Sequence, residues 1–146
     1  MKVDFYRRCR SKTEGRYVDE CLESGLETDG PFTQRLTAAW GRLCPGSYSL
    51  FTTSCTTALE TALGCLDLRP GDEVILPSFN FPSAANGALL HGGVPVLCDI
   101  DPDTQNISLK DMEGRIGPRT RAVVVVHYAG VSCPMEELKK LRMLQI

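Results

Sequence analysis

Long hydrophobic runs are absent from the sequence: none approaches the ~20 residues that a membrane-spanning helix requires. No two of the seven cysteines stand in the C-x-x-C spacing that zinc sites usually show, so we expect no metal centre. The basic segment 1–12 is followed by no apolar stretch, which predicts no secretory signal. A reducing, cytoplasmic setting follows, in which most of the thiols are expected to be small buried apolar groups.

An excess of charge of one sign is also missing. The 146 residues include 16 basic and 18 acidic side chains, which gives a net charge of −2, and the sequence pI is about 5.7. Without a broad basic face, nucleic acid is excluded as a partner. Hydrophobic residues make up 42% and charged residues 23%, as expected of a folded globular chain of one-domain size.

The first 48 residues predict helices and connections. A short helix is expected over 17–24, ending before Gly25, and a turn is expected over 28–31. Pro31 suits the first turn of a second helix. Apolar side chains at intervals of three or four predict one apolar face on that helix: Phe32, Leu36, Trp40 and Leu43.

From residue 49 onward, short β-rich runs alternate with helical ones. The expected strands are 49–53, 73–77, 94–99 and 121–127. The expected helices are 56–66, 82–90, a short one after Ser108, and 134–144. The first of these helices begins at Thr57 or at Ser54, since both suit an N-cap. Four consecutive valines over 123–126 predict a strand that is buried on both faces.

This alternation predicts a doubly wound α/β fold with a mainly parallel sheet. It divides the chain into a helical, connecting segment, 1–48, and an α/β domain, 49–146. Such folds bind ligands beyond the carboxyl ends of their strands, which selects the loops 53–57, 77–82, 99–105 and 127–133.

The first two loops carry the clearest chemistry. Loop 53–57 joins a strand to a helix, and its hydroxyls and free N–H groups suit either a phosphate or a plain N-cap cluster. It is not a Walker A loop, and no G-x-G-x-x-G is present. Loop 77–82 carries Phe79 and Phe81, of which at most one is expected to stack on a flat ligand; the alternative is core packing.

The remaining polar positions have mainly structural interpretations. The acidic run over 99–103 departs from an EF-hand at Thr104 and Lys110, so we expect a surface turn. Asn106 fits a glycosylation pattern, although nothing predicts secretion. His91 is expected to have a structural role at a helix end, whereas His127, which closes a buried strand, is open between a functional and a structural role.

Four stretches between about residues 24 and 138 carry a resemblance to a known family. They read SGLETDGPFTQR, TTSCTTALETALGCLDLRPGDEVILPSFNFPSAANG, GGVPVLCDIDPDTQNIS and TRAVVVVHYAGVSCPMEEL. In content, order and spacing, the chain resembles the DegT-type sugar aminotransferases. These enzymes use pyridoxal phosphate (PLP) and have the aspartate-aminotransferase fold. The type that the chain most resembles is the dTDP-4-amino-4,6-dideoxygalactose transaminases, which aminate a nucleotide-linked 4-keto-6-deoxy sugar.

The resemblance implies roles for the first two loops. Ser54, Cys55 and Thr56 match the loop that grips the cofactor phosphate through backbone N–H groups and hydroxyls. Phe81 matches the aromatic residue that stacks on the pyridine ring, which leaves Phe79 as a core residue.

The resemblance also implies substrates and a partner. Thr28, Asp29 and Gly30 match a turn near the sugar-nucleotide pocket, and His127 and Tyr128 belong to a signature beside the active site, with no chemical step assigned. An amino acid, with glutamate as the expected donor, would pass its amino group to a nucleotide-linked keto sugar. Family members place the active site across a dimer interface, so a homodimer is expected.

The catalytic residues of the family are expected to lie outside this chain. The family needs an Asp that holds the pyridinium nitrogen and a Lys that forms a Schiff base with PLP, and both would follow residue 146. None of the lysines stands in the family's lysine motif: Lys2, Lys12, Lys110, Lys139 and Lys140. The chain alone is therefore expected to be inactive. The alternatives are a PLP-dependent sugar dehydratase of the same family, with a His in place of the Lys, and a non-catalytic truncated remnant.

Overall fold

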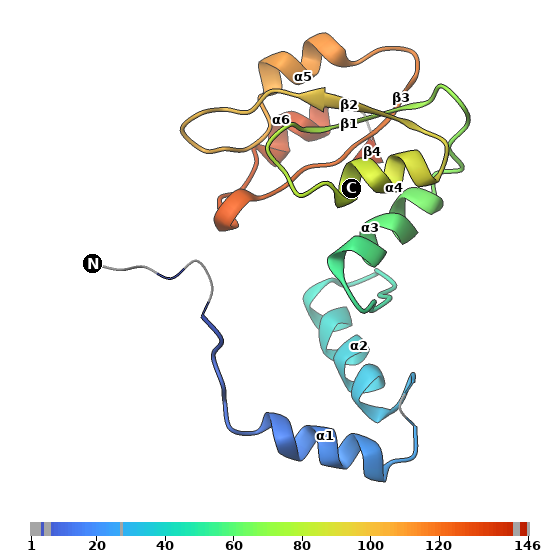
Figure 1. The fold of residues 1–146 in the computed structure, drawn as a ribbon, viewed down its shortest axis with the longest axis vertical. Helices are drawn as coiled ribbons and strands as arrows, with labels where there is room; N and C mark the ends of the chain where they lie inside the picture. The colour runs from blue at the N-terminus through green and yellow to red at the C-terminus, as the bar shows by residue number, and fades with distance from the viewer. Residues whose placement is uncertain (1–3, 5–6, 27, 142–143, 146) are drawn as a thin grey trace. The chain divides into compact units, whose positions relative to one another are not determined.

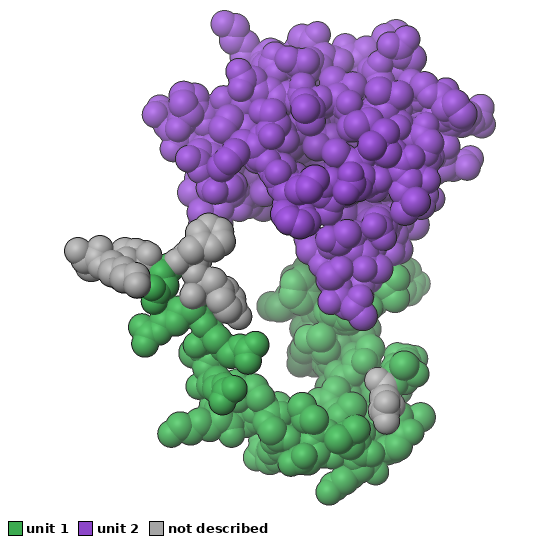
Figure 2. Space-filling model, in the orientation of Figure 1, with its two compact units in different colours: residues 1–51 green, residues 52–146 purple. Residues whose placement is uncertain are grey.

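The computed structural model describes residues 4, 7–26, 28–141 and 144–145. The chain forms two compact units, residues 1–51 and 52–146 (Figure 2). The boundary predicted from the sequence lies between residues 48 and 49, and the assignment of 49–146 as part of a cofactor-binding domain stays a prediction. Within the described residues, no helix is long and apolar enough to span a membrane.

The first unit contains two amphipathic helices, α1 (Glu14–Glu23) and α2 (Pro31–Leu43). Pro31 occupies the first turn of α2, as the sequence predicts. Neither helix has a buried residue. The predicted apolar face makes aromatic contacts instead: the Phe32 ring meets the Tyr17 ring edge to face with centroids 5.6 Å apart, and Trp40 meets Phe51 at 6.4 Å.

The strand predicted over 49–53 is wrong. These residues have no regular secondary structure, and Leu50 is exposed. A β-rich segment becomes a strand only when a neighbouring strand supplies hydrogen-bond partners. Among the described residues, no strand pairs with 49–53, because the sheet is formed entirely by later segments.

The second unit is built on a parallel sheet of β1 (Glu73–Pro77), β2 (Val94–Cys98), β3 (Thr120–Val123) and β4 (Leu144–Gln145). The strand order is β2-β1-β3-β4, and every pair is parallel (Figure 1). Ile75 at the centre pairs with Val96 on one side and with Val123 on the other. The predicted α/β fold with a parallel sheet is therefore confirmed.

Helices cover both faces of this sheet. The helices are α3 (Cys55–Gly64), α4 (Ser83–Leu90), α5 (Leu109–Arg115) and α6 (Met135–Lys140), with a 3₁₀ turn, η1 (Tyr128–Gly130). Figure 1 draws α3 and α4 on one side of the sheet and α5 on the other. Ala122 and Val124 belong to the core beneath α3 and α4, whereas Val123 belongs to the core beneath α5 and α6. The predicted burial on both faces is confirmed for this part of the valine run.

Two predicted elements have different ends in the structure. The strand predicted over 121–127 ends at Val123, and the Val124 N–H donates one further bond to the Ile75 carbonyl at 2.8 Å. The helix predicted over 134–144 ends at Lys140, because Leu144 and Gln145 pair with β3 instead. Of the two predicted starts for α3, the structure has Ser54 as the N-cap.

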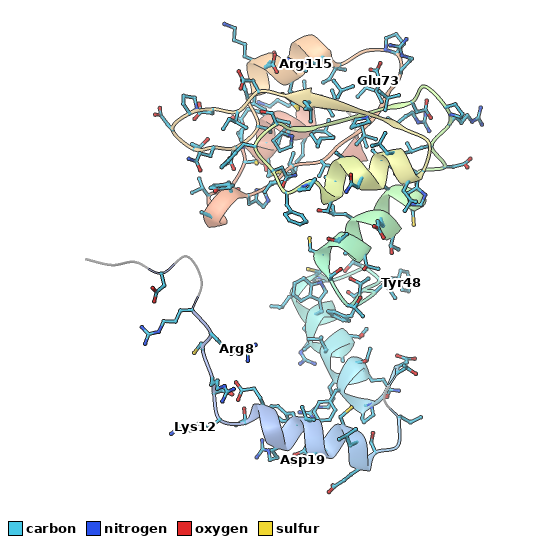
Figure 3. The ribbon with its side chains drawn as sticks, viewed as in Figure 1. Arg8, Lys12, Asp19, Tyr48, Glu73 and Arg115 are labelled. Atoms are coloured by element: carbon cyan, nitrogen blue, oxygen red, sulfur yellow. The ribbon has the colours of Figure 1, made fainter. Side chains whose placement is uncertain are left out.

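An ion pair lies at the amino-terminal ends of the strands. Glu73 opens β1, and Figure 3 labels it. Its Oε1 atom accepts bonds from Arg119 Nε at 2.9 Å and from Arg119 Nη2 at 2.7 Å. Three of the loops that the sequence singles out, 77–82, 99–105 and 127–133, follow the opposite, carboxyl ends of β1, β2 and β3, whereas loop 53–57 follows no strand.

Candidate functional site

A groove opens where the sheet reverses its direction of winding. The neighbouring strands β1 and β3 lead to α4 and α6, which pack against opposite faces of the sheet. Such a reversal is the point at which open α/β sheets bind ligands. The groove lies there and has a volume of about 390 Å³. Its lining comes from the two loops that follow these strands: Phe79, Asn80, Phe81, Pro82, Val126 and Tyr128.

Larger hollows are found elsewhere in the chain. Two of them, with volumes of about 610 and 520 Å³, are lined by residues between 8 and 42, on an extended segment and two helices. A third, of about 490 Å³, is lined by residues 101–110, after the edge strand β2, with Ser132 and Pro134, and by none of the loop after β1. Fold topology therefore favours the smaller groove between β1 and β3 as the ligand site.

Three aromatic side chains line the groove: Phe79, Phe81 and Tyr128. Phe79 packs against Tyr128 with ring centroids 5.2 Å apart and an interplanar angle of 42°. Phe79 is 48% exposed, so its prediction as a core residue is wrong: it lies past the end of β1, and its ring covers the loop after β3 instead of entering the core. Phe81 is 71% exposed, which leaves its ring face free for a ligand.

Short hydrogen bonds hold the β1–α4 loop at its base. The Ser78 N–H donates to the Cys98 carbonyl at 2.7 Å, which extends the pairing of β1 with β2 by one residue. Asn80 Oδ1 accepts from the N–H of Phe81 at 2.7 Å. α4 then starts directly after Pro82. The backbone that carries Phe81 is thus fixed on both sides of the aromatic residue.

The amino terminus of α3 presents a second polar feature in the same unit. The Ser54 side chain accepts the Thr57 N–H at 3.1 Å, and the Ser54 carbonyl accepts the Ala58 N–H at 3.1 Å. The N–H groups of Cys55 and Thr56 lie in the first turn of α3 and have no acceptor within the helix. Together with the positive end of the helix dipole and the nearby hydroxyls, they suit an anionic oxygen. The structure has the predicted N-cap at Ser54, and phosphate binding by this loop stays a prediction.

The loop after β3 is held in a strained conformation. Ala129 has a φ of 49° and Gly130 a φ of 83°, both in the left-handed region. His127 is an exposed residue, and its Nδ1 accepts the Cys133 N–H at 3.0 Å. The sequence leaves His127 open between a functional and a structural role, and the contact observed here is a structural one.

One residue of this site was missed by the sequence reasoning. Asn106 is buried, and its amide bonds to the loop after β3: Nδ2 donates to the Val131 carbonyl, and Oδ1 accepts from the Tyr128 N–H, each at 3.0 Å. The glycosylation pattern at Asn106 gave no hint of this role, since its partners lie 22 and 25 residues further along the chain. Both polar atoms of the side-chain amide therefore form hydrogen bonds within the protein.

The acidic run before Asn106 forms the predicted surface turn. Asp101 Oδ1 accepts from the N–H groups of Asp103 and Thr104 at 3.0 and 2.9 Å. Hydrogen bonds from Thr104, first through its N–H and then through its hydroxyl, lower the pKa of Asp101. In the described part of the chain, no group of three or more His, Cys, Asp or Glu side chains is arranged to hold a metal ion.

A charged cluster joins β2 to α5. Asp111 Oδ2 accepts from Arg115 Nε at 2.6 Å and from the Asp99 N–H at 2.7 Å. These bonds, with that from Arg115 the larger, lower the pKa of Asp111 to about 2. Burial is the main cause that raises the pKa of the Cys98 thiol to about 12, and it raises the pKa of Cys133 as well.

The prediction that most thiols are buried is wrong for this chain. Only Cys98 and Cys133 are buried; Cys21 is half-buried, and the other four are exposed: Cys9, Cys44, Cys55 and Cys65. The exposed thiols lie on the N-terminal segment and at helix ends, where little of the surrounding chain covers them.

The predicted sugar-side turn belongs to the first unit. Asp29 has a φ of 49°, and Gly30 immediately precedes α2. A side chain at position 30 would meet the Leu26 carbonyl, so only glycine fits there. The role of Thr28, Asp29 and Gly30 near a sugar nucleotide stays a prediction.

Comparisons with known proteins identify relatives of the chain. The spore coat polysaccharide biosynthesis protein SpsC of Bacillus subtilis (strain 168) is 39% identical over 127 residues, which are 87% of this chain and 33% of SpsC. The putative sugar aminotransferase Spr1654 of Streptococcus pneumoniae, in its PMP form, has a TM-score of 0.87 at 28% identity, covering 96% of this chain and 35% of that one. The aminotransferase TlmJ of Streptoalloteichus hindustanus has a TM-score of 0.86 at 32% identity, covering 96% and 39%.

The chain thus spans about a third of the length of these relatives. An Escherichia coli GDP-4-keto-6-deoxy-D-mannose-3-dehydratase with bound hydrated PLP has a TM-score of 0.83 at 20% identity, a likeness that concerns the fold alone. The family model of the DegT/DnrJ/EryC1/StrS aminotransferases matches residues 8–143, nearly the whole chain. The chain belongs to the DegT/DnrJ/EryC1/StrS aminotransferase family.

Proposed function

We propose that this chain forms the phosphate-binding and ring-binding part of a PLP-dependent sugar aminotransferase. The observation that carries the proposal is a pairing within one compact unit: a helix amino terminus with free N–H groups, at α3, and an aromatic groove at the switch point between β1 and β3. Family membership and the PMP form of Spr1654 support PLP as the cofactor.

The phosphate of PLP would bind at the start of α3. Ser54 uses its hydroxyl oxygen to cap the Thr57 N–H, which leaves the N–H groups of Cys55 and Thr56 to donate to phosphate oxygens. The Cys55 thiol takes no part, because the contact is made by the backbone. The helix dipole adds a favourable field for a dianion.

The ring of PLP would lie against Phe81. A flat heteroaromatic ring gains from offset stacking on an exposed aromatic face, and Phe81 offers such a face. Phe79 and Tyr128 support the neighbouring wall of the groove. When bound, PLP supplies an electron sink that allows an amino group to be exchanged between two substrates.

The complete protein would move an amino group from an amino acid, with glutamate as the proposed donor, to a nucleotide-linked 4-keto-6-deoxy sugar. Thr28, Asp29 and Gly30, with His127 and Tyr128, are the proposed substrate-side residues. The relation to a polysaccharide biosynthesis protein, SpsC, supports a sugar substrate. A homodimer and a cytoplasmic location belong to the same proposal. The groove is lined by no amine or carboxylate, so we propose that this chain alone does not transaminate.

The test is a binding titration with pyridoxamine phosphate, which needs no covalent link to a lysine. Ser54→Asp keeps an N-cap acceptor of equal rank but places a negative charge at the phosphate. At a separation near 4 Å this repulsion is worth about 1–4 kcal/mol, so the affinity for pyridoxamine phosphate should fall about fivefold or more. The affinity for pyridoxamine, which lacks the phosphate, should stay the same.

Ser108→Asp is the matched control. Ser108 caps α5 as Ser54 caps α3, with its Oγ accepting the Asp111 N–H at 3.4 Å. The control variant should bind pyridoxamine phosphate like the wild type. Equal affinities for the wild type, Ser54→Asp and Ser108→Asp would refute the phosphate site, and a wild-type chain without measurable binding would refute the proposed function.

A further inference from the structure

Asn106 is a buried residue whose side-chain amide joins two loops at the carboxyl ends of the strands. Its side chain is 3% exposed, and both its polar atoms bond to the loop after β3, through the Val131 carbonyl and the Tyr128 N–H. A buried amide that lost these partners would incur a desolvation penalty. The two bonds therefore favour one position of that loop over all others.

The backbone of Asn106 is itself held firmly. Its carbonyl accepts the Asp101 N–H at 2.9 Å, and its N–H donates to Thr104 Oγ1 at 3.3 Å. The next residue, Ile107, is buried in the core beneath α5 and α6, and it forms a β-bridge with Ile100. The amide thus projects from a fixed base, not from a freely moving loop.

The loop that receives these bonds needs such support. Ala129 adopts a left-handed φ of 49°, which a residue with a Cβ rarely does and which is unfavourable by about 1 kcal/mol or more. Its neighbour Tyr128 packs on Phe79, and both rings line the groove. A continuous path of contacts therefore runs from the Asp101 turn through Asn106 and Tyr128 to the wall of the groove.

We propose that Asn106 is a positioning residue for the cofactor-ring groove: its amide fixes Tyr128, and through Tyr128 the ring of Phe79, without touching the ligand. This inference rests on the proposed function, because it assigns the groove to the pyridine ring. Asn106 acts on the ring end of the ligand only, whereas Ser54 acts on the phosphate end.

The first test replaces the amide by an apolar side chain of similar size, Asn106→Leu. The protein is labelled with fluorotyrosine and followed by ¹⁹F NMR. The chain has only four tyrosines, and the signal of Tyr128 is assigned as the one that is missing from Tyr128→Phe. We expect the Tyr128 signal to shift and the affinity for pyridoxamine phosphate to fall about three- to tenfold, as for the loss of one aromatic contact. The affinity for inorganic phosphate should not change.

Thr120→Val is the matched control. Thr120 is also buried, and its Oγ1 accepts the Gly117 N–H at 2.9 Å, but it lies at the amino end of β3. This variant removes one buried hydrogen bond and should leave both the Tyr128 signal and the ligand affinity unchanged. If losing any buried polar group is enough, Thr120→Val will also shift the Tyr128 signal and weaken ligand binding, and that result would overturn the proposal.

Asn106→Asp provides a rescue by pH. A neutral carboxylic acid accepts from the Tyr128 N–H and donates to the Val131 carbonyl as the amide does, whereas a carboxylate has no hydrogen to donate. The Tyr128 signal should therefore return toward its wild-type position as the pH falls through the pKa of this carboxyl, and it should not return in Asn106→Leu.

The outcomes separate this inference from the proposed function. A wild-type chain that binds no pyridoxamine phosphate overturns the proposed function. A wild-type chain that binds it, with an Asn106→Leu variant that binds equally well or keeps the Tyr128 signal in place, overturns the role of Asn106 alone.

Discussion

Gly87 in α4 offers a quantitative test of how α3 and α4 pack. A Cβ at this position would lie 2.8 Å from Leu63 Cδ1, and Leu63 is fully buried, so its methyl group has no solvent to move into. Overpacking of this kind costs about 1–3 kcal/mol, while alanine in place of glycine regains about 1 kcal/mol of helix propensity. Gly87→Ala should therefore lower the free energy of unfolding by about 1 kcal/mol.

The effect of Gly87→Ala on the free energy of unfolding should change sign once the Leu63 methyl group is removed. Leu63→Ala alone should cost about 2–5 kcal/mol by leaving a cavity. In that background Gly87→Ala meets no methyl group and should stabilise by about 1 kcal/mol, which gives a coupling energy of about 2 kcal/mol. Urea unfolding followed by far-ultraviolet circular dichroism measures all four corners of the cycle.

Gly114→Ala in α5 is the control, because nothing lies within 4 Å of a Cβ there. It should stabilise the chain in both backgrounds. If Gly87→Ala has the same sign in both backgrounds, the packing argument is refuted. The contact matters for the site because α3 begins at the proposed phosphate cradle and α4 follows the loop that carries Phe81.

Two further predictions concern ionisable groups. Because hydrogen bonds lower the pKa of Asp111 from an ordinary 3.8 to about 2, its stabilising effect is complete above pH 4 and is lost as the pH falls toward 2. Asp111→Asn should therefore reduce the decline of the melting temperature across that window, whereas Glu136→Gln, which breaks only an exposed pair with Lys139, should not. For the thiols, brief alkylation of the native chain at pH 8 should modify Cys55 and Cys65 and spare Cys98, whose pKa is about 12. Rapid modification of Cys98 in the native state, seen by mass spectrometry of its peptide, would contradict its burial.

Local patterns were enough to predict much of the second unit. β1 has the predicted bounds, Glu73–Pro77, because a short apolar run is enclosed by turn residues on both sides. The capping spacing of Ser108 with Asp111 predicted α5, and Ser108 caps it. The valine run predicted a strand that is buried on both faces, since consecutive side chains of a strand point to opposite faces.

Features that depend on distant partners were not predictable from such patterns. Residues 49–53 have strand-like composition, but a strand needs a neighbour, and composition does not say whether one is present. Phe79 looks like a core residue until the fold brings Tyr128 against it. Asn106 reads as a polar loop residue, and its burial follows only from contacts with a segment more than twenty residues away.

The contact between His127 and Cys133 determines where the imidazole carries its hydrogen. Nδ1 accepts the Cys133 N–H, so the neutral ring is the Nε2–H tautomer, and its free edge offers a donor to any approaching group. The Nδ1 lone pair is therefore the acceptor that joins the two ends of residues 127–133, the loop that frames the groove.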